Sequence, residues 1–312
     1  MKAFFATRYG GPGVMRLGEL PDPSPGAGEV LVAVKAASVN PVDWKVRNSG
    51  NRLVSGRPPK VLGTDLSGLV AALGAGVSGI AVGSAVYGTT RMMFGAQGSH
   101  AEQVAVPAKR VVPLPAGLSF EEAAALPVAA LTALNGLRQC GELQGKAVVV
   151  VGATGGVGHF AVQIARARGA RVTAVSSARN ADRARALGAE DVVDYGREDF
   201  TRGNRRWDVV FDAHGGLAFP AAVLSERGVF ATTLPRVATV LGLLWHRLAG
   251  GRQIALANLR DRPEDYAELS RLLASGAVRP VVGRVFPLEQ AAEAFAALEA
   301  GGIVGKVVIR VG

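Results

Sequence analysis

The chain has 312 residues, enough for about two domains with sizeable hydrophobic cores. Hydrophobic residues make up 49% and charged residues 19%, a balance typical of a globular protein and not of a disordered one. The formal net charge is +10, but the arginines are scattered and neither a run of five basic residues nor a nucleic-acid motif is present, so no nucleic-acid partner is expected.

We expect a soluble, cytoplasmic protein that has no membrane-spanning segment. The N-terminal apolar stretch is too short for a signal peptide, and the apolar run 237–245 is too short to cross a bilayer. Residues 147–165 are apolar over a greater length, but their glycines mark a turn between a strand and a helix. The single cysteine, Cys140, excludes an intramolecular disulfide.

Residues 1 to about 115 read as short strands separated by turns rich in glycine and proline, with hardly any helical period. The expected strands include 29–35, 61–71, 101–106 and 110–115. This pattern is typical of a small, irregular, mostly antiparallel barrel.

Helical sequence begins at Ser119, which forms a capping box with Glu122, and a second helix is expected from about Val128 to Cys140. Beyond residue 147 strands and helices alternate, which predicts an α/β fold with a doubly wound parallel sheet. Strands are expected at 147–151, 171–175, 191–194, 207–212, 228–233 and 253–258, and helices at 180–187, 218–224 and 263–274. The tail departs from this alternation, with strands at 281–286 and 306–311 around a helix at 287–300, as if it returned to complete the first domain.

The most informative motif is the glycine-rich turn after the strand 147–151. Ala153-x-Gly155-x-x-Gly158 is a variant of the dinucleotide-binding fingerprint, with alanine at its first glycine place. Gly155 lets the backbone approach a pyrophosphate, Gly158 lets the helix pack close to the strand, and the free N–H groups of the helix face the anion. Strand, turn, helix and strand within about thirty residues predict a dinucleotide site.

The residues after the second strand indicate which dinucleotide binds. An NAD-specific site places Asp or Glu there, about twenty residues past the turn, to bind the ribose 2′-hydroxyl. This chain has Ser176 and Ser177, with Arg179 just beyond, and these side chains supply donors for a 2′-phosphate. The expected cofactor is therefore NADPH.

Six segments along nearly the whole chain then occur in one order and at one spacing: Asn40-Pro-Val-Asp43-Trp44-Lys45, Leu62-Gly-Thr-Asp65-Leu-Ser-Gly68, Gly152–Gly158, Ser176–Asn180, Asp194-Tyr195 and Gly305-Lys-Val-Val308. Together they resemble the zinc-free medium-chain dehydrogenase/reductases, with quinone oxidoreductases and alkenal/one oxidoreductases as the closest branch. The resemblance implies a GroES-like barrel as catalytic domain (1–118 and 277–312) and a Rossmann NADPH-binding domain (119–276). It also implies a small-molecule substrate held between the domains and a homodimer formed through the edge strand 253–258.

The resemblance also bears on metal. Zinc-dependent relatives carry a cysteine in the stretch from Asn40 to Asp43 and a His-Glu pair at Thr64-Asp65, and this chain has neither thiolate nor imidazole there. No metal is expected. Without a Lewis acid, hydride addition to a quinone or a conjugated C=C bond suits the site better than alcohol oxidation, because hydrogen-bond donors can stabilise the delocalised anion that develops.

By the same resemblance, Asn40 lies near the nicotinamide and substrate. Asp65 and Lys45 are candidates for an ion pair that ties the cleft together, a role more often structural than catalytic, and Tyr87 is a candidate proton donor, with water as the alternative. Asn40 would otherwise be an ordinary turn residue before a proline. The expected cofactor contacts are Thr132, Gly152, Thr154, Gly155, Gly156, Val157, Ser176, Ser177, Arg179, Tyr195, His214 and Lys306. The expected substrate wall consists of Trp44, Met92, Met93, Phe94 and Trp245, for which core or dimer packing is the alternative.

Three functions stay open on the sequence. The first is an NADPH-dependent, zinc-independent oxidoreductase that transfers hydride to a quinone or to the C=C bond of an α,β-unsaturated carbonyl. The second is a biosynthetic enoyl reductase with a specialised substrate, which fits His100 standing where relatives usually carry an aromatic residue. The third is an NADPH-binding regulatory or structural protein with little turnover.

Overall fold

The computed structural model describes residues 1–49, 56–90, 92, 96–234 and 251–312. Contacts within the chain divide it into two compact units. Unit 1 comprises Met1–Val128, Asp261–Pro263 and Pro280–Gly312, and unit 2 comprises Ala129–Arg260 and Glu264–Arg279. The sequence pattern places the first boundary after residue 118, whereas α3 (Phe120–Ala124) belongs to unit 1 because it packs on strands of that unit.

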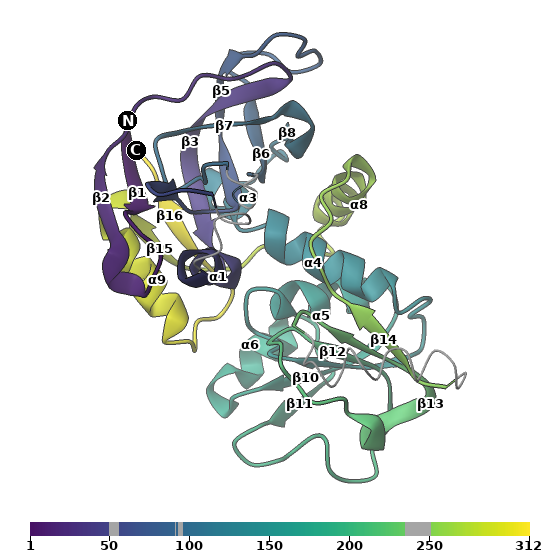
Figure 1. Ribbon diagram of the computed structural model, residues 1–312. Helices are drawn as coiled ribbons and strands as arrows, with labels where there is room; N and C mark the ends of the chain where they lie inside the picture. The colour runs from purple at the N-terminus through teal and green to yellow at the C-terminus, as the bar shows by residue number, and fades with distance from the viewer. Residues whose placement is uncertain (50–55, 91, 93–95, 235–250) are drawn as a thin grey trace. The chain divides into compact units, whose positions relative to one another are not determined.

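Unit 1 is built mainly from antiparallel strands (Figure 1). Its larger sheet has the order β15-β16-β3-β5-β6-β8, with β7 also paired to β3, and a small sheet has the order β2-β1-β4. The strands are β1 (Lys2–Ala6), β2 (Met15–Glu19), β3 (Glu29–Val39), β4 (Lys60–Val61), β5 (Asp65–Leu73), β6 (Ala85–Thr89), β7 (Gln103–Pro107), β8 (Val111–Pro113), β15 (Val282–Pro287) and β16 (Lys306–Arg310).

The C-terminal tail returns to unit 1. Strand β16 pairs with β3 antiparallel and with β15 parallel, and α9 (Ala291–Glu299) packs on both β15 and β16. Alternate residues of β3, among them Val30, Val32 and Val34, point into one hydrophobic core together with Val307 and Ile309 of β16. A strand from the far end of the chain therefore lies inside the sheet, between β15 and β3.

Helix α1 (Pro41–Ser49) was not anticipated, and the expectation of hardly any helical period before residue 115 is wrong at this place. Val46 is the single apolar residue of this helix that is buried, so the periodic signal is weak. The helix instead begins at a local cap: Pro41 occupies the first position, and the Asp43 carboxylate accepts the backbone N–H of Asn40 at 2.7 Å.

Unit 2 contains a six-stranded sheet in the order β11-β10-β9-β12-β13-β14, and every adjacent pair is parallel. Numbered along the chain this is 3-2-1-4-5-6, the doubly wound dinucleotide-binding order, so the predicted fold class is confirmed. The elements are β9 (Ala147–Val151), β10 (Arg171–Ser176), β11 (Asp191–Asp194), β12 (Trp207–Asp212), β13 (Leu224–Thr232), β14 (Gln253–Leu256), α5 (Gly158–Ala167), α6 (Ala181–Ala186) and α8 (Pro263–Ala274). Helix α4 (Pro127–Arg138) starts at the boundary between the units.

The helix expected at 218–224 is wrong. The chain forms only a short 3-10 turn at Ala221–Val223, and β13 begins directly at Leu224, which pairs with Trp207 of β12. Val223 and Leu224 are fully buried. Sheet pairing and burial therefore override the helical preference of the alanines.

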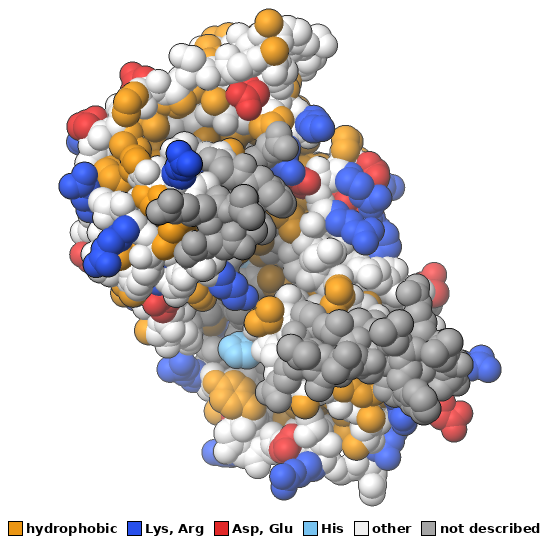
Figure 2. All heavy atoms as spheres, viewed as in Figure 1, with side chains coloured by type: hydrophobic (Ala, Val, Ile, Leu, Met, Phe, Trp, Pro, Cys, Tyr) orange, Lys and Arg blue, Asp and Glu red, His pale blue; other side chains and the backbone are white. Residues whose placement is uncertain are grey.

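Charged side chains are spread over the surface. On the face shown in Figure 2, Lys and Arg side chains are interleaved with Asp and Glu. Several exposed arginines of unit 2 have an acidic partner, for example Arg185 with Asp182 at 3.0 Å and Arg205 with Asp191 at 2.5 Å. Within the described ranges, no helix is long and apolar enough to cross a membrane.

Candidate active site and dinucleotide-binding edge

The glycine turn of unit 2 has the geometry that its sequence requires. Gly152 follows β9 with a φ of +71°, a left-handed conformation that favours glycine. A Cβ placed on Gly158 would lie 2.0 Å from the carbonyl oxygen of Gly152, so only glycine fits where α5 leaves the turn. At Gly155 the nearest atom would be 3.3 Å away, so this residue leaves the backbone open on its outer side. Gly158 thus carries the close helix–strand contact of the fingerprint.

Apart from Thr132, which lies in α4, the predicted cofactor contacts of unit 2 follow neighbouring strands. Because β9, β10, β11 and β12 are parallel, the residues after their carboxyl ends share one edge of the sheet with the glycine turn. Tyr195, after β11, donates its backbone N–H to the carbonyl of Ser176 at the end of β10, at 3.2 Å. A Cβ on Gly152 would lie 3.3 Å from the Cβ of His214, which follows β12. The structure therefore brings these segments together.

Exposure separates this set into two groups. Thr132, Thr154 and Ser176 are buried, whereas Arg179, His214 and Tyr195 are exposed, Tyr195 to 65%. In the part of the chain that the structure describes, Arg179 has no ion pair. Its guanidinium can therefore accept an anion without first breaking a salt bridge. Gly155, Gly156 and Val157 are partly exposed along the turn.

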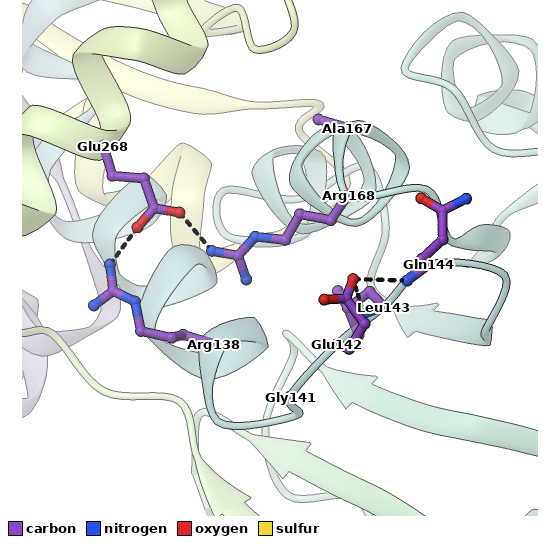
Figure 3. Close-up of a pocket in the computed structure, with 8 residues that line it drawn as sticks. All are labelled: Arg138, Gly141, Glu142, Leu143, Gln144, Ala167, Arg168 and Glu268. Carbon is purple, nitrogen blue, oxygen red and sulfur yellow. Dashed lines mark hydrogen bonds and ion pairs between the residues drawn. The ribbon is translucent and has the colours of Figure 1, made fainter.

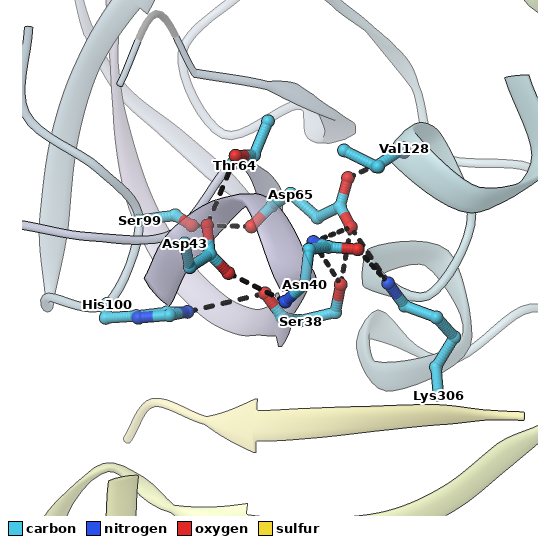
Figure 4. Close-up of polar contacts among 9 residues, drawn as sticks. All are labelled: Ser38, Asn40, Asp43, Thr64, Asp65, Ser99, His100, Val128 and Lys306. Atoms are coloured by element: carbon cyan, nitrogen blue, oxygen red, sulfur yellow. Dashed lines mark hydrogen bonds and ion pairs between the residues drawn. The ribbon is translucent and has the colours of Figure 1, made fainter. Parts of the chain in front are cut away.

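The predicted residues of unit 1 form a buried polar cluster around Asn40, which is 3% exposed (Figure 4). Its amide nitrogen donates to Asp65 Oδ2 at 2.8 Å and to Ser38 Oγ at 3.4 Å, and its amide oxygen accepts from Lys306 Nζ at 2.5 Å. Both ends of the Asn40 amide are therefore engaged inside the protein.

Asp65 is the centre of this cluster. One carboxylate oxygen accepts the backbone N–H of Val128 at 2.8 Å, and the other accepts the Ser38 hydroxyl at 2.5 Å and forms an ion pair with Lys306 Nζ at 3.4 Å. The expected ion pair between Asp65 and Lys45 is wrong. Lys45 is exposed on α1. The buried partner of Asp65 is Lys306, the first residue of β16, which pairs with β3. Lys306, expected at the cofactor, is 3% exposed and faces this cluster.

Asp43 is fully buried beside the cluster. Burial raises the pKa of its carboxyl from an ordinary 3.8 to about 7, and the nearby negative charge of Asp65 acts in the same direction. The Asn40 N–H, Lys306 and the Thr64 hydroxyl, which donates to Asp43 at 3.3 Å, oppose the rise. Asp43 therefore titrates near neutral pH while it holds the start of α1.

His100 is a member of the same neighbourhood whose place the sequence did not reveal. Its ring is fully buried, its Nε2 donates to the Ser38 carbonyl at 3.3 Å, and it packs edge-on against Phe295 with the ring centroids 5.4 Å apart. Burial lowers the pKa of His100 from 6.5 to about 4. The imidazole is therefore neutral at physiological pH. The unusual histidine in a Gly-Ser-His-Ala-Glu segment was the only sequence signal.

The remaining predicted residues are buried in unit 1, pack on its core or lie outside the described residues. Tyr87, the candidate proton donor, lies in β6 and has no exposed surface. Met92 is 1% exposed and belongs to the core of unit 1, and Trp44 packs partly buried against that core. Met93, Phe94 and Trp245 lie outside the described residues.

Lys60 is a further buried cation of unit 1. Its ammonium group donates to the backbone carbonyls of Met92, at 2.7 Å, and of Ala96. Burial lowers the pKa of Lys60 to about 8. No sequence signal distinguishes it from an ordinary surface lysine, because its burial depends on distant segments.

Unit 2 also has a surface pocket of about 580 Å³ (Figure 3), lined by Arg138, Gly141, Glu142, Leu143, Gln144, Ala167, Arg168 and Glu268. Glu268 bridges the two arginines, at 2.5 Å from Arg138 and 2.6 Å from Arg168. Both arginines of the pocket are thus paired with Glu268, and none of the predicted site residues lines it. Among the residues that the structure describes, no group of three or more His, Cys, Asp or Glu side chains is arranged to hold a metal ion.

Comparisons with known proteins cover the whole chain. A family model described as "Alcohol dehydrogenase GroES-like domain" matches residues 26–116, and one described as "Zinc-binding dehydrogenase" matches residues 187–309. A 2-methylene-furan-3-one reductase of Solanum lycopersicum is 34% identical, and an NADPH-dependent alkenal/one oxidoreductase, chloroplastic, of Arabidopsis thaliana is 33% identical; each match covers 99% of this chain and 79% of the relative. The structure of the quinone oxidoreductase from Coxiella burnetii superposes with a TM-score of 0.90 at 32% identity, over 100% of this chain and 99% of that one.

Proposed function

Because the chain belongs to the medium-chain dehydrogenase/reductase family, in its quinone oxidoreductase branch, we propose that it is an NADPH-dependent reductase of quinones or α,β-unsaturated carbonyls. The observation that carries the proposal is similarity over the full length to enzymes named for such substrates, together with an intact dinucleotide-binding edge. The oxidoreductase class and the nicotinamide-binding fold follow from the family itself.

The residues of unit 2 fit a nicotinamide dinucleotide. The backbone from Gly152 to Val157 would hold the pyrophosphate, because no Cβ closes the outer side of Gly155. When bound, the cofactor supplies the hydride. The protein then has to orient the cofactor, exclude water and stabilise the negative charge that develops on the reduced substrate.

Preference for NADPH over NADH is supported by the donors at the end of β10. Ser177 and Arg179 lie there, Arg179 without an ion pair to any described residue, and Tyr195 lies at the end of the next strand. No carboxylate directly follows β10 to repel a 2′-phosphate. A guanidinium and hydroxyl groups are suited to bind that phosphate.

Independence from metal is supported by the chemistry of the Asn40 cluster. The cluster offers an amide, hydroxyls and two carboxylates but no thiolate, and the nearby His100 imidazole donates its Nε2 N–H to the Ser38 carbonyl, so these groups do not make the ligand shell that a catalytic zinc prefers. Moreover, the Lys306 ammonium already neutralises Asp65. A divalent cation there would have to displace a buried lysine that holds the same oxygen.

The test is NADPH oxidation by the purified protein with a panel of quinones, enones and alkenals, with and without a strong chelator. We expect turnover that the chelator leaves unchanged and a higher kcat/KM with NADPH than with NADH. R179A should reduce kcat/KM for NADPH about tenfold, while its value for NADH stays nearly unchanged, because one charge-assisted contact is lost. Preference for NADH, or activity that chelation abolishes and zinc restores, would contradict the proposal. Tight NADPH binding without any turnover would favour a regulatory role.

Two further expectations belong to this proposal. We propose a homodimer formed through the edge strand β14, which light scattering of the purified protein would check. The cytoplasmic location expected from the sequence stays a prediction, and the relative from Arabidopsis thaliana is chloroplastic.

A further inference from the structure

The turn that carries Arg179 is not capped by the side chain of Ser177, the residue that precedes it. Residues Ala178–Asn180 form a 3-10 turn between β10 and α6, and Ser177 precedes it as the cap residue. A serine in this place ordinarily accepts a backbone N–H with its hydroxyl. Here the Ser177 side chain makes no capping hydrogen bond.

The missing cap comes from the next strand of the sheet. Asp194, the last residue of β11, accepts the backbone N–H of Ala178 at 3.2 Å. The same carboxylate oxygen accepts the N–H of Gly196 at 3.0 Å, directly after Tyr195. One carboxylate therefore ties the turn after β10 to the segment after β11, which are the two places where the proposed 2′-phosphate contacts lie.

A second contact holds the other end of the same turn. The Asn180 amide nitrogen lies 3.4 Å from Thr154 Oγ1, which belongs to the glycine turn. The Ser177–Asn180 segment is thus fastened on the side of β11 by Asp194 and on the side of β9 by Thr154. In the described structure, the Ser177 hydroxyl and the Arg179 guanidinium are left without a protein partner.

We propose that Asp194 is a positioning residue of the dinucleotide site, whose carboxylate caps the Ala178–Asn180 turn from the neighbouring strand and thereby leaves Ser177 and Arg179 available to a ligand phosphate. The inference rests on the proposed preference for NADPH and explains how this preference is built. Asp194 carries a negative charge, but one of its carboxylate oxygens accepts two backbone N–H groups. It therefore supports anion binding by fixing the turn that carries the phosphate donors. Its other oxygen is 3.7 Å from the exposed Arg197, which offsets the charge.

Three substitutions separate geometry from charge. D194N keeps an oxygen in the same place and removes the negative charge. D194E keeps the charge but carries the oxygens one methylene further from Ala178. D194A removes both. The matched control is D191A, which removes a carboxylate from the first residue of the same strand, where it pairs with the surface residue Arg205.

The measurement is calorimetric binding of 2′,5′-ADP and of 5′-AMP, which differ only in the 2′-phosphate. We expect the wild type and D191A to bind 2′,5′-ADP more tightly than 5′-AMP. D194A and D194E should weaken the binding of 2′,5′-ADP about tenfold and that of 5′-AMP by less than about threefold, because the phosphate donors lose their fixed placement. D194N should bind 2′,5′-ADP with an affinity that is higher than that of the wild type or at most about threefold lower.

The binding of 5′-AMP shows in the same experiment that each variant has a folded site. The inference is overturned if D194A and D194E discriminate between the two ligands as strongly as the wild type, or if D194N loses as much as D194E. Weaker binding of 5′-AMP alone would instead make Asp194 a direct ribose ligand, and would equally overturn it. If the wild type does not distinguish the two ligands, the proposed preference for NADPH itself fails.

Discussion

Single residues in unit 1 show how strongly burial changes the pKa of an ionisable side chain. Asp43 and His100 are both fully buried, and burial shifts both toward their neutral forms. The pKa of the acid rises to about 7 and that of the base falls to about 4. Because one group is an acid and the other a base, their contributions to stability depend on pH in opposite directions.

The first prediction concerns Asp43. Its pKa is about 7 in the folded protein and near 3.8 in the unfolded chain, so the folded state holds the proton more tightly. Its contribution to the free energy of unfolding is fully present below pH 4 and is lost as the pH rises to about 7, by on the order of 4 kcal/mol. D43N keeps an oxygen for the Asn40 N–H and removes the titration. Urea unfolding of both proteins between pH 4 and 8 should show the variant gaining stability over the wild type as the pH rises.

His100 is the complementary case, because its contribution to stability changes with pH in the opposite direction. Its contribution is present above pH 6.5 and is lost as the pH falls toward 4, because only the unfolded chain then binds the proton. H100Q should therefore gain stability relative to the wild type on acidification. A stability difference between D43N and wild type that does not change with pH would contradict the assignment for Asp43.

At the scale of elements, the connection from β9 to α5 combines two different uses of glycine. Position 158 requires glycine because a Cβ there would lie only 2.0 Å from the Gly152 carbonyl oxygen. At Gly155 the same carbonyl oxygen would lie 3.3 Å from a Cβ, a tight contact that a shift of a few tenths of an ångström relieves. One glycine serves packing, and the other leaves space for a ligand.

The second prediction separates these uses. G158A should lower the free energy of unfolding by about 2–3 kcal/mol, since α5 has to move away from the turn. G155A should change the stability by less than about 1 kcal/mol, and yet weaken the binding of NADPH at least tenfold, because the new methyl group lies on the side left for the pyrophosphate. Thermal unfolding and fluorescence titration with NADPH measure the two effects. Equal loss of stability in both variants would show that the two glycines share one role.

At the scale of the whole molecule, the Asn40 cluster depends on residues from both ends of the chain. Lys306 Nζ and Asn40 Oδ1 are in contact although 266 positions separate the two residues in sequence. The contact exists because β16 pairs with β3. The polar centre of unit 1 therefore forms only when the C-terminal tail has docked.

The third prediction tests this long-range contact with a double-mutant cycle. K306M leaves the buried Asp65 carboxylate without its cation and should lower the free energy of unfolding by about 3–5 kcal/mol. In K306M/D65N no charge remains to be compensated, so the double variant should be less destabilised than the sum of K306M and D65N by at least about 1 kcal/mol. Urea unfolding measures all four proteins. Additivity within about 0.5 kcal/mol would mean that the two side chains are not coupled.

Much of the fold was predictable from local signals. The capping box at Ser119, the strand 207–212 and the helix at 263–274 all appear as expected, because caps, alternation and glycine turns act over a few residues. The helix at 218–224 failed for the opposite reason: local alanine preference gave way to pairing with β12. Helix α1 was missed because its start depends on a cap between Asn40 and Asp43 and not on hydrophobic period.

The sequence by itself determined the doubly wound sheet, the glycine turn and the polar residues after β10, since each is written in a short stretch of neighbouring residues. Only the tertiary structure decided which side chains meet: Lys306 rather than Lys45 at Asp65, and Asp194 at the turn of Arg179. The physical reason is that strand pairing sets these contacts. Such pairing joins residues far apart in the chain, and the local spacing of residue types carries no record of it.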